Sequence, residues 1–155
     1  MNWQSVFGVT NAIALIGWLL LLLAPRRPLT LSLVLYAAVG MLCLIYTVLF
    51  LALVGGAVDP VPAPGAKPAS LADYSVRGLR AMFASDGAIT VGWTHYLALD
   101  LFTGLWIARD ADGKGVGRLL QAPVLLATYL AGPLGLLIWL VAREPLARRQ
   151  ARNAS

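Results

Sequence analysis

Charged residues are scarce in this sequence. Asp, Glu, Lys and Arg make up only 12% of its 155 residues, whereas about a quarter of a soluble domain is charged. Hydrophobic residues make up 59%, and the mean hydropathy is +0.77. The net charge of +5 at pH 7 comes from residues between and after the apolar runs, with no continuous basic face. The composition therefore excludes an ordinary soluble domain, gives little support for nucleic-acid binding, and predicts an integral membrane protein whose main partner is lipid.

Cysteine and histidine occur once each. Cys43 lies inside an apolar run and has no second cysteine with which to form an internal disulfide. One Cys and one His also fall short of the three or four ligands of a zinc-type site. The spacing of Asp110, Asp112 and Gly113 is similar to the start of a calcium loop, but the other oxygen ligands and the terminal Glu are missing. We therefore expect no metal and no cofactor.

Four apolar runs are long enough, at about 20 residues, to cross a bilayer. They cover residues 3–24, 29–54, 88–108 and 119–142. No basic residue precedes the first run and no small-residue cleavage motif follows it, which favours a retained span over a signal peptide. In the last run, Pro133 beside glycines predicts a kink near mid-membrane. The sequence predicts one all-α domain over residues 1–155, an integral membrane four-helix bundle with several passes through a bacterial inner (cytoplasmic) membrane.

Residues 55–87 differ in composition from the apolar runs. Five prolines or glycines between residues 59 and 68 forbid a helix and favour an extended loop. Beyond this loop, Ser70 with Asp73 three positions later is typical of a helix N-terminus, and apolar and charged residues follow. This segment is too short and too charged to span. We therefore expect a short amphipathic helix in the membrane interface between the second and third spans.

The basic residues do not agree on one membrane orientation. Four spans would divide them between the two sides. One group is Arg26, Arg27, Arg109, Lys114 and Arg118; the other is Lys67, Arg77, Arg80 and, in the basic tail 143–155, Arg143, Arg148, Arg149 and Arg152. The larger group favours cytoplasmic termini, whereas the uncharged N-terminus followed by two arginines favours the opposite orientation.

The third run carries both an acid and a histidine in its interior. An ionisable group near the bilayer centre costs from about 3 to more than 10 kcal/mol, so it usually has a partner or a function. At about 100° per residue, Asp100 shares a helix face with Trp93 and Tyr96, whereas His95 lies roughly 140° away from it. The two side chains therefore cannot form a hydrogen-bonded pair on one regular helix, and each needs a partner from another helix.

Polar residues of the other runs supply candidate partners. Asn11 and Thr47 should lie in the same membrane half as His95, and Thr128 should approach the level of Asp100. We expect these groups to turn inward and to form a partly polar pocket, with candidate substrate-binding residues Asn11, Tyr36, Thr47, Trp93 and Thr128 around His95, Tyr96 and Asp100. The same residues are compatible with a purely structural role in helix packing, with binding or catalysis, or, less readily, with proton or ion conduction.

Three stretches form a distinctive pattern. They are residues 92–102 (GWTHYLALDLF) followed by Gly104, Trp106 and Ile107, residues 132–137 (GPLGLL), and the opening from Asn11 to Pro25. In these stretches and in its four-span layout, which together cover nearly the whole chain, the sequence resembles the abscisic-acid-deficient-four-like family of small membrane proteins. The family pattern has Phe where this chain has Leu99, and often Arg where it has Leu105. The second difference removes a basic group beside the third span.

The resemblance implies a membrane-embedded role in carotenoid chemistry, because plant members are tied to neoxanthin formation. In that reaction an epoxide opens and a proton is lost to leave an allene, an isomerisation that needs no redox cofactor. Such a reaction requires an acid for the epoxide oxygen and a base for a carbon-bound proton. His95, Asp100 and Tyr96 are the candidate catalytic residues, and a carotenoid or another isoprenoid is the expected ligand.

The alternative is a protein that binds a lipid or pigment, or scaffolds a partner enzyme, without catalysis. In that case Asp100 would only hold the helices together. A transporter would need a polar path to both membrane surfaces, and the sequence has no charged series toward each end. The sequence leaves open whether the chain forms a homo-oligomer.

Overall fold

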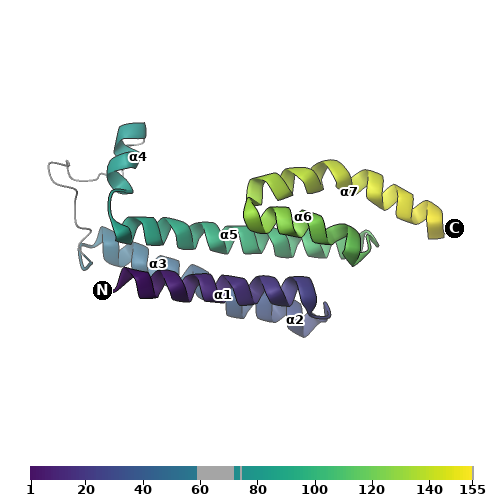
Figure 1. Cartoon of the computed structure of the whole chain (residues 1–155), viewed down its shortest axis with the longest axis horizontal. Helices are drawn as coiled ribbons and strands as arrows, with labels where there is room; N and C mark the ends of the chain where they lie inside the picture. Colours follow the sequence, from purple (N-terminus) through teal and green to yellow (C-terminus); the bar gives the residue numbers. More distant parts are fainter. Residues whose placement is uncertain (59–71, 74, 155) are drawn as a thin grey trace.

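A computed structural model describes residues 1–58, 72–73 and 75–154. Every regular element in these ranges is a helix, which confirms the predicted all-α fold (Figure 1). The elements are α1 (Trp3–Leu23), α2 (Pro28–Ser32), the π-helix η1 (Leu33–Val39), α3 (Gly40–Val54), α4 (Val76–Met82), α5 (Asp86–Gly113), α6 (Arg118–Leu130) and α7 (Gly132–Ala154). The predicted Pro-rich loop and the predicted cap at Ser70 lie outside the described residues. A short helix does follow them, and the Ser75 hydroxyl caps it by accepting from the Gly78 N–H.

Within the described residues, two helical stretches are long and apolar enough to cross a membrane. They are α1, with 21 residues, and the continuous stretch α2–η1–α3 from Pro28 to Val54, with 27 residues. Both agree with the first two predicted runs to within one residue at each end. The two stretches suggest, by length and composition, that the chain associates with a membrane.

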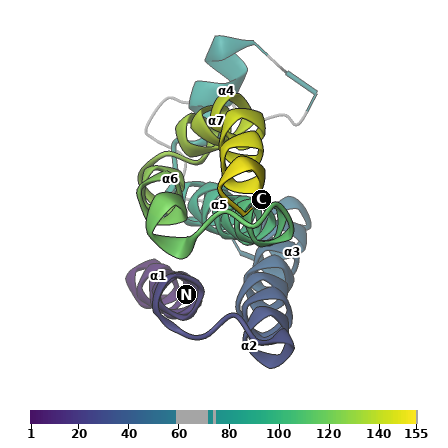
Figure 2. The same cartoon turned by 90° about the vertical axis from the view of Figure 1, so that its right-hand side faces the viewer.

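Helix α5 is the central element of the bundle. It packs against α1, η1, α3, α6 and α7, as the end-on view shows (Figure 2). The sequence predicts a span from 88 to 108 and then a charged turn, but the helix extends over 28 residues to Gly113. The expected turn is wrong: Asp110 and Asp112 still lie on α5, where they pair with Arg143 of α7 and with Arg26 of the turn between α1 and α2.

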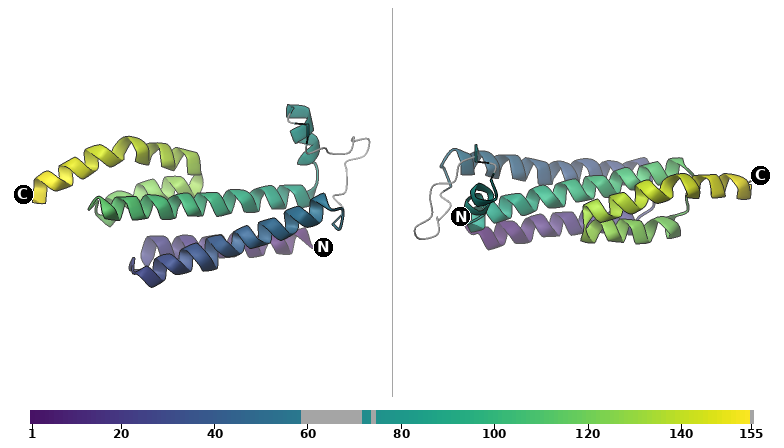
Figure 3. Two further views of the ribbon diagram at one scale, coloured as in Figure 1. Left: turned by 180° about the vertical axis from the view of Figure 1, so that it is seen from behind. Right: turned by 90° about the horizontal axis from the view of Figure 1, so that it is seen from above.

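The fourth predicted span is not one helix. Ala131 has an extended backbone (φ −158°, ψ 91°), α6 ends before it, and α7 begins after it. The Ala131 carbonyl then accepts from the N–H groups of Leu134 and Gly135, which starts the new helix. Figures 1 and 3 show α6 and α7 folded back on each other along the C-terminal half of α5. Residues 119–142, predicted as one span with a kink at Pro133, therefore form two helices, and the chain reverses between them.

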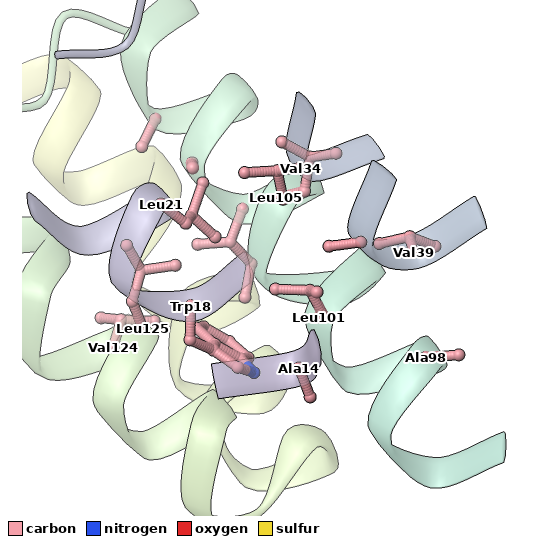
Figure 4. Close-up of a cluster of buried hydrophobic side chains, with 14 of the residues drawn as sticks. Ala14, Trp18, Leu21, Val34, Val39, Ala98, Leu101, Leu105, Val124 and Leu125 are labelled. Carbon is pink, nitrogen blue, oxygen red and sulfur yellow. The ribbon is translucent and has the colours of Figure 1, made fainter. Parts of the chain in front are cut away.

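Glycines allow the helices to approach closely. A Cβ atom on Gly135 would overlap the Thr128 backbone, so α6 and α7 touch main chain to main chain at this point. A Cβ on Gly104 would overlap the Trp18 ring, which is only 2% exposed. This ring lies in a cluster that joins α1, η1, α5 and α6, with Leu21, Val34, Leu101, Leu105 and Leu125 among its members (Figure 4). The cluster holds α5 in place beside the hairpin.

Candidate active site at the tip of the hairpin

The Asp100 carboxyl lies where α7 begins. Asp100 is 8% exposed, and a Cβ on Gly132, the first residue of α7, would overlap its Oδ1 atom. Its carboxyl interacts with the Tyr96 hydroxyl, one turn earlier on α5, and with the Gly132 N–H. The Gly132 N–H also interacts with the Tyr96 oxygen. A carboxyl, a phenol and a backbone N–H therefore converge at the hairpin tip.

The sequence explains this convergence. The first N–H groups of a helix have no partner within the helix, and the N-terminus of a helix favours negative charge. Asp100 supplies an acceptor to α7 from a different helix, and the missing side chain of Gly132 lets it come close. The Oδ2 atom of Asp100 is buried and has no hydrogen-bond partner among the described residues.

Three aromatic rings extend from this site toward the N-terminal end of α5. The rings of Trp93 and Tyr96 stack with centroids 5.5 Å apart, and those of Phe7 and Trp93 stack at 5.9 Å. The Trp93 Nε1–H donates to the Asn11 Oδ1 atom at 3.2 Å, which ties this part of α5 to α1. We call Phe7, Trp93 and Tyr96 the aromatic face; its members are 37%, 40% and 36% exposed.

His95 lies apart from Asp100, as the helical spacing predicts. Its ring contacts Tyr46 of α3, with centroids 5.4 Å apart, and Tyr46 stacks in turn on Phe50. Thr47 is exposed on α3, where its hydroxyl donates to the Cys43 carbonyl at 2.8 Å. His95 is also exposed, so the prediction that these two side chains turn inward is wrong. The histidine therefore faces α3, while the carboxyl faces the hairpin.

Two further candidate binding residues have different surroundings. Tyr36 is 74% exposed, so the prediction that it turns inward is wrong. The reason is that η1 turns Val34, Ala38 and Val39 toward the core instead. Thr128 is fully buried in α6, and its hydroxyl donates to the Val124 carbonyl at 2.8 Å, a bond within its own helix.

A polar network that the sequence did not predict lies at the other end of α5. Asp110 accepts two hydrogen bonds from the Arg143 guanidinium, at 2.9 and 3.0 Å, and one from the Trp139 Nε1–H at 2.9 Å. The Arg143 guanidinium also lies 5.9 Å from the Trp106 ring. The Lys114 ammonium binds the Glu144 carboxylate at 3.0 Å, which holds the pKa of that carboxyl below its usual value. These contacts bring the C-terminal half of α7 back to the end of α5. The expectation that Arg143 and Lys114 lie on opposite sides of the membrane is therefore wrong.

A second arginine joins this network from the turn between α1 and α2. The Arg26 guanidinium donates to the Asp112 carboxylate at 2.9 Å, to the Ala108 carbonyl at 3.3 Å and to the Gln121 side-chain oxygen. Burial lowers the pKa of this guanidinium from its ordinary value, and the Asp112 charge opposes that shift. The sequence shows two arginines in the turn and two aspartates near the end of α5. It gives no sign that the turn and the helix end are in contact.

A comparison with protein-family models identifies the family. The model described as ABA DEFICIENT 4-like matches residues 5–139, which include the hairpin tip and the aromatic face. No curated protein and no solved structure matches the chain. Because the family model covers most of the sequence, the chain belongs to the ABA DEFICIENT 4-like family.

Proposed function

We propose that this protein is a membrane-embedded isomerase of a carotenoid or related isoprenoid, and that Tyr96, Asp100 and Gly132 form its active site. Family membership supports a role related to neoxanthin formation. The observation that carries the assignment to this site is the buried Asp100 carboxyl, whose Oδ2 atom has no hydrogen-bond partner among the described residues. Such an oxygen can exchange a proton with a bound molecule.

The three groups are suited to opening an epoxide. The Tyr96 hydroxyl donates its proton to the epoxide oxygen as the carbon–oxygen bond breaks, and the Gly132 N–H stabilises the charge on that oxygen. The Asp100 carboxylate removes a proton from the neighbouring carbon, and the electron pair of the carbon–hydrogen bond forms the new double bond. The proton then passes from Asp100 to Tyr96, with which it interacts. Substrate and product are isomers, so the reaction consumes no oxidant and no reductant.

The aromatic face supports a long conjugated substrate. Stacked rings favour contact with another π-system, and the partial exposure of Phe7, Trp93 and Tyr96 leaves part of each ring available. The face runs along the helix and ends at Tyr96, next to the carboxyl. An extended apolar molecule bound there would bring a terminal oxygen to Asp100.

We leave His95 out of the proton-transfer pair. Its contact with Tyr46 places it toward α3, and Asp100 faces Gly132 of α7. His95 therefore serves as a control on the same helix.

The proposal is tested in a host that makes epoxy-carotenoids. The wild-type protein should produce an isomer of unchanged mass that lacks the epoxide, detected by chromatography with mass and absorbance readouts. The variant Asp100→Asn should lower the conversion rate by about two to four orders of magnitude, and Tyr96→Phe should also lower it, because each removes a proton-transfer group. His95→Gln and Glu144→Gln should retain conversion at equal protein abundance. Full conversion by a folded Asp100→Asn variant would refute the assignment.

Binding of a pigment or lipid without catalysis is the second candidate, and the exposed aromatic face favours it. In that case the purified protein would carry visible absorbance or an extractable isoprenoid, while the carotenoids of the host stayed unchanged. Trp93→Leu would then reduce the bound pigment more strongly than Asp100→Asn.

A further inference from the structure

The C-terminus and the turn between α1 and α2 lie at the same end of the bundle. Arg118, at the start of α6, donates to the carbonyl groups of Leu22 and Ala24, the latter of which ends α1. The Asp110–Arg143 and Lys114–Glu144 pairs hold the C-terminal half of α7 beside the C-terminal end of α5. Figure 1 shows the C-terminus and the α1–α2 turn at one end, and the N-terminus and α4 at the other.

The two ends differ in charge. We define the basic end as the α1–α2 turn, the C-terminal end of α5, the start of α6 and the C-terminal half of α7. Nine of the twelve Lys and Arg residues belong to it, namely Arg26, Arg27, Arg109, Lys114, Arg118, Arg143, Arg148, Arg149 and Arg152. Of the other three, Arg77 and Arg80 lie in α4 at the opposite end, and Lys67 lies outside the described residues. Basic residues near the ends of membrane helices face the cytoplasm more often than not, so this imbalance favours one orientation.

The basic end presents exposed cations as well as buried or partly buried ion pairs. Arg26, Arg143 and Lys114 are engaged with acidic partners, which ties the elements together. Arg27, Arg109 and Arg148 are exposed on three different elements. Cations spread over one surface in this way complement the anionic headgroups of a lipid leaflet.

The hairpin tip is compatible with burial in a bilayer. Non-helical backbone at membrane depth is tolerated only where protein or water covers its polar groups. At the tip, the Ala131 carbonyl accepts from the first N–H groups of α7, and the Gly132 N–H interacts with the Asp100 carboxyl. The reversal therefore does not leave these groups to the lipid.

We propose that α6 and α7 form a re-entrant hairpin and that the basic end faces the anionic headgroups of the cytoplasmic leaflet. The hairpin enters and leaves at this surface, and the start of α1 and helix α4 lie on the opposite side of the membrane. A four-span bundle would instead put the start of α1 and the end of α7 on the same side. The proposal does not depend on the reaction described above.

Four single-cysteine variants of the full chain test this orientation. They carry Cys43→Ser to remove the native thiol, and each adds one exposed cysteine: Gln4→Cys in α1, Val76→Cys in α4, Gly113→Cys at the end of α5, or Pro145→Cys in α7. A Cβ at Gly113 meets no atom within 4 Å, so this substitution causes no strain. A membrane-impermeant maleimide is applied to intact and to permeabilised bacterial spheroplasts, and labelling of the denatured protein measures the reactivity of each thiol.

In intact spheroplasts, the cysteines in α1 and α4 should be labelled at least ten-fold more than those in α5 and α7. Permeabilisation should bring all four to a similar level. If only one of Gly113→Cys and Pro145→Cys is labelled in intact spheroplasts, the two positions lie on different sides, and the re-entrant hairpin is overturned. Labelling of both in intact spheroplasts would overturn the cytoplasmic placement of the basic end. Equal accessibility of Gln4→Cys and Pro145→Cys would show that the start of α1 and the end of α7 share a side, and would also overturn the proposal.

Discussion

The close approach of α6 and α7 predicts that Gly135→Ala weakens the hairpin. A methyl group on residue 135 would overlap the backbone N and Cα atoms of Thr128 as well as its hydroxyl. A flexible side chain could rotate away from such a contact, but backbone atoms cannot. The two helices must therefore separate, and the hairpin tip with Gly132 must move relative to Asp100.

The magnitude follows from two opposing effects. Replacing Gly by Ala inside a helix gains up to about 1 kcal/mol in helix propensity, whereas overpacking a tight contact costs about 1 to 3 kcal/mol. Because the overlap at Gly135 involves backbone atoms, the overpacking cost should lie at the upper end of this range, and the net change should be destabilising. Gly8→Ala is the matched control, because a Cβ there meets no atom within 4 Å and only the propensity gain remains. The two substitutions, chemically identical, should change stability in opposite directions.

Thermal unfolding in detergent, followed by tryptophan fluorescence, measures both effects. For a chain of this size, 1 kcal/mol corresponds to roughly 2 to 4 °C in Tm, so Gly135→Ala should lower Tm by several degrees and Gly8→Ala should raise it slightly. Thr128→Ala should not restore the Tm of Gly135→Ala, since the backbone overlap persists. An unchanged or raised Tm for Gly135→Ala, or full rescue by Thr128→Ala, would refute the main-chain contact between α6 and α7.

Two other contacts can be tested in the same assay. Gly132→Ala should lower Tm, because its methyl group meets the Asp100 carboxyl, and Asp100→Ala should reduce that penalty in the double variant by roughly 0.5 to 3 kcal/mol of coupling; strictly additive changes would contradict the contact. Asp110→Ala should cost about 1 to 3 kcal/mol, because it leaves a partly buried guanidinium and an indole N–H without their acceptor. Glu144→Ala, which breaks a more exposed ion pair, should lower Tm less than Asp110→Ala does, and an equal loss of Tm in both variants would contradict the larger contribution of the Asp110 network.

Local sequence signals predicted the individual helices well. The first two apolar runs agree with the structure to within one residue at each end because unbroken apolar sequence leaves a helix as the only way to satisfy the backbone. The separation of His95 from Asp100 was likewise predictable, since it depends only on the rotation per residue of one helix. Trp93, Tyr96 and Asp100 share a face for the same reason, and the structure places them in one row.

Contacts between helices were not predictable in this way. Thr128 and Tyr36 seemed equivalent as polar groups on apolar helices, but one is fully buried and the other is 74% exposed. The difference depends on which face each helix turns to its neighbours. Asp110 and Arg143 are separated by 33 positions in the sequence. Their hydrogen bonds depend on the fold, which brings α7 back to the end of α5.

The sequence alone determined that this is an apolar, helical chain, where its first two long helical stretches lie, and that a carboxyl and an imidazole occupy different faces of the helix after them. Hydropathy and helical periodicity are local properties, so the residues themselves carry that information. The tertiary structure decided that residues 118–154 form a hairpin of two helices instead of one continuous helix and that its tip meets Asp100. An apolar run of about 24 residues satisfies hydropathy equally well as one straight helix or as two that fold back. The packing of Gly135 on Thr128 and the arginine pairs of the basic end favour the second arrangement.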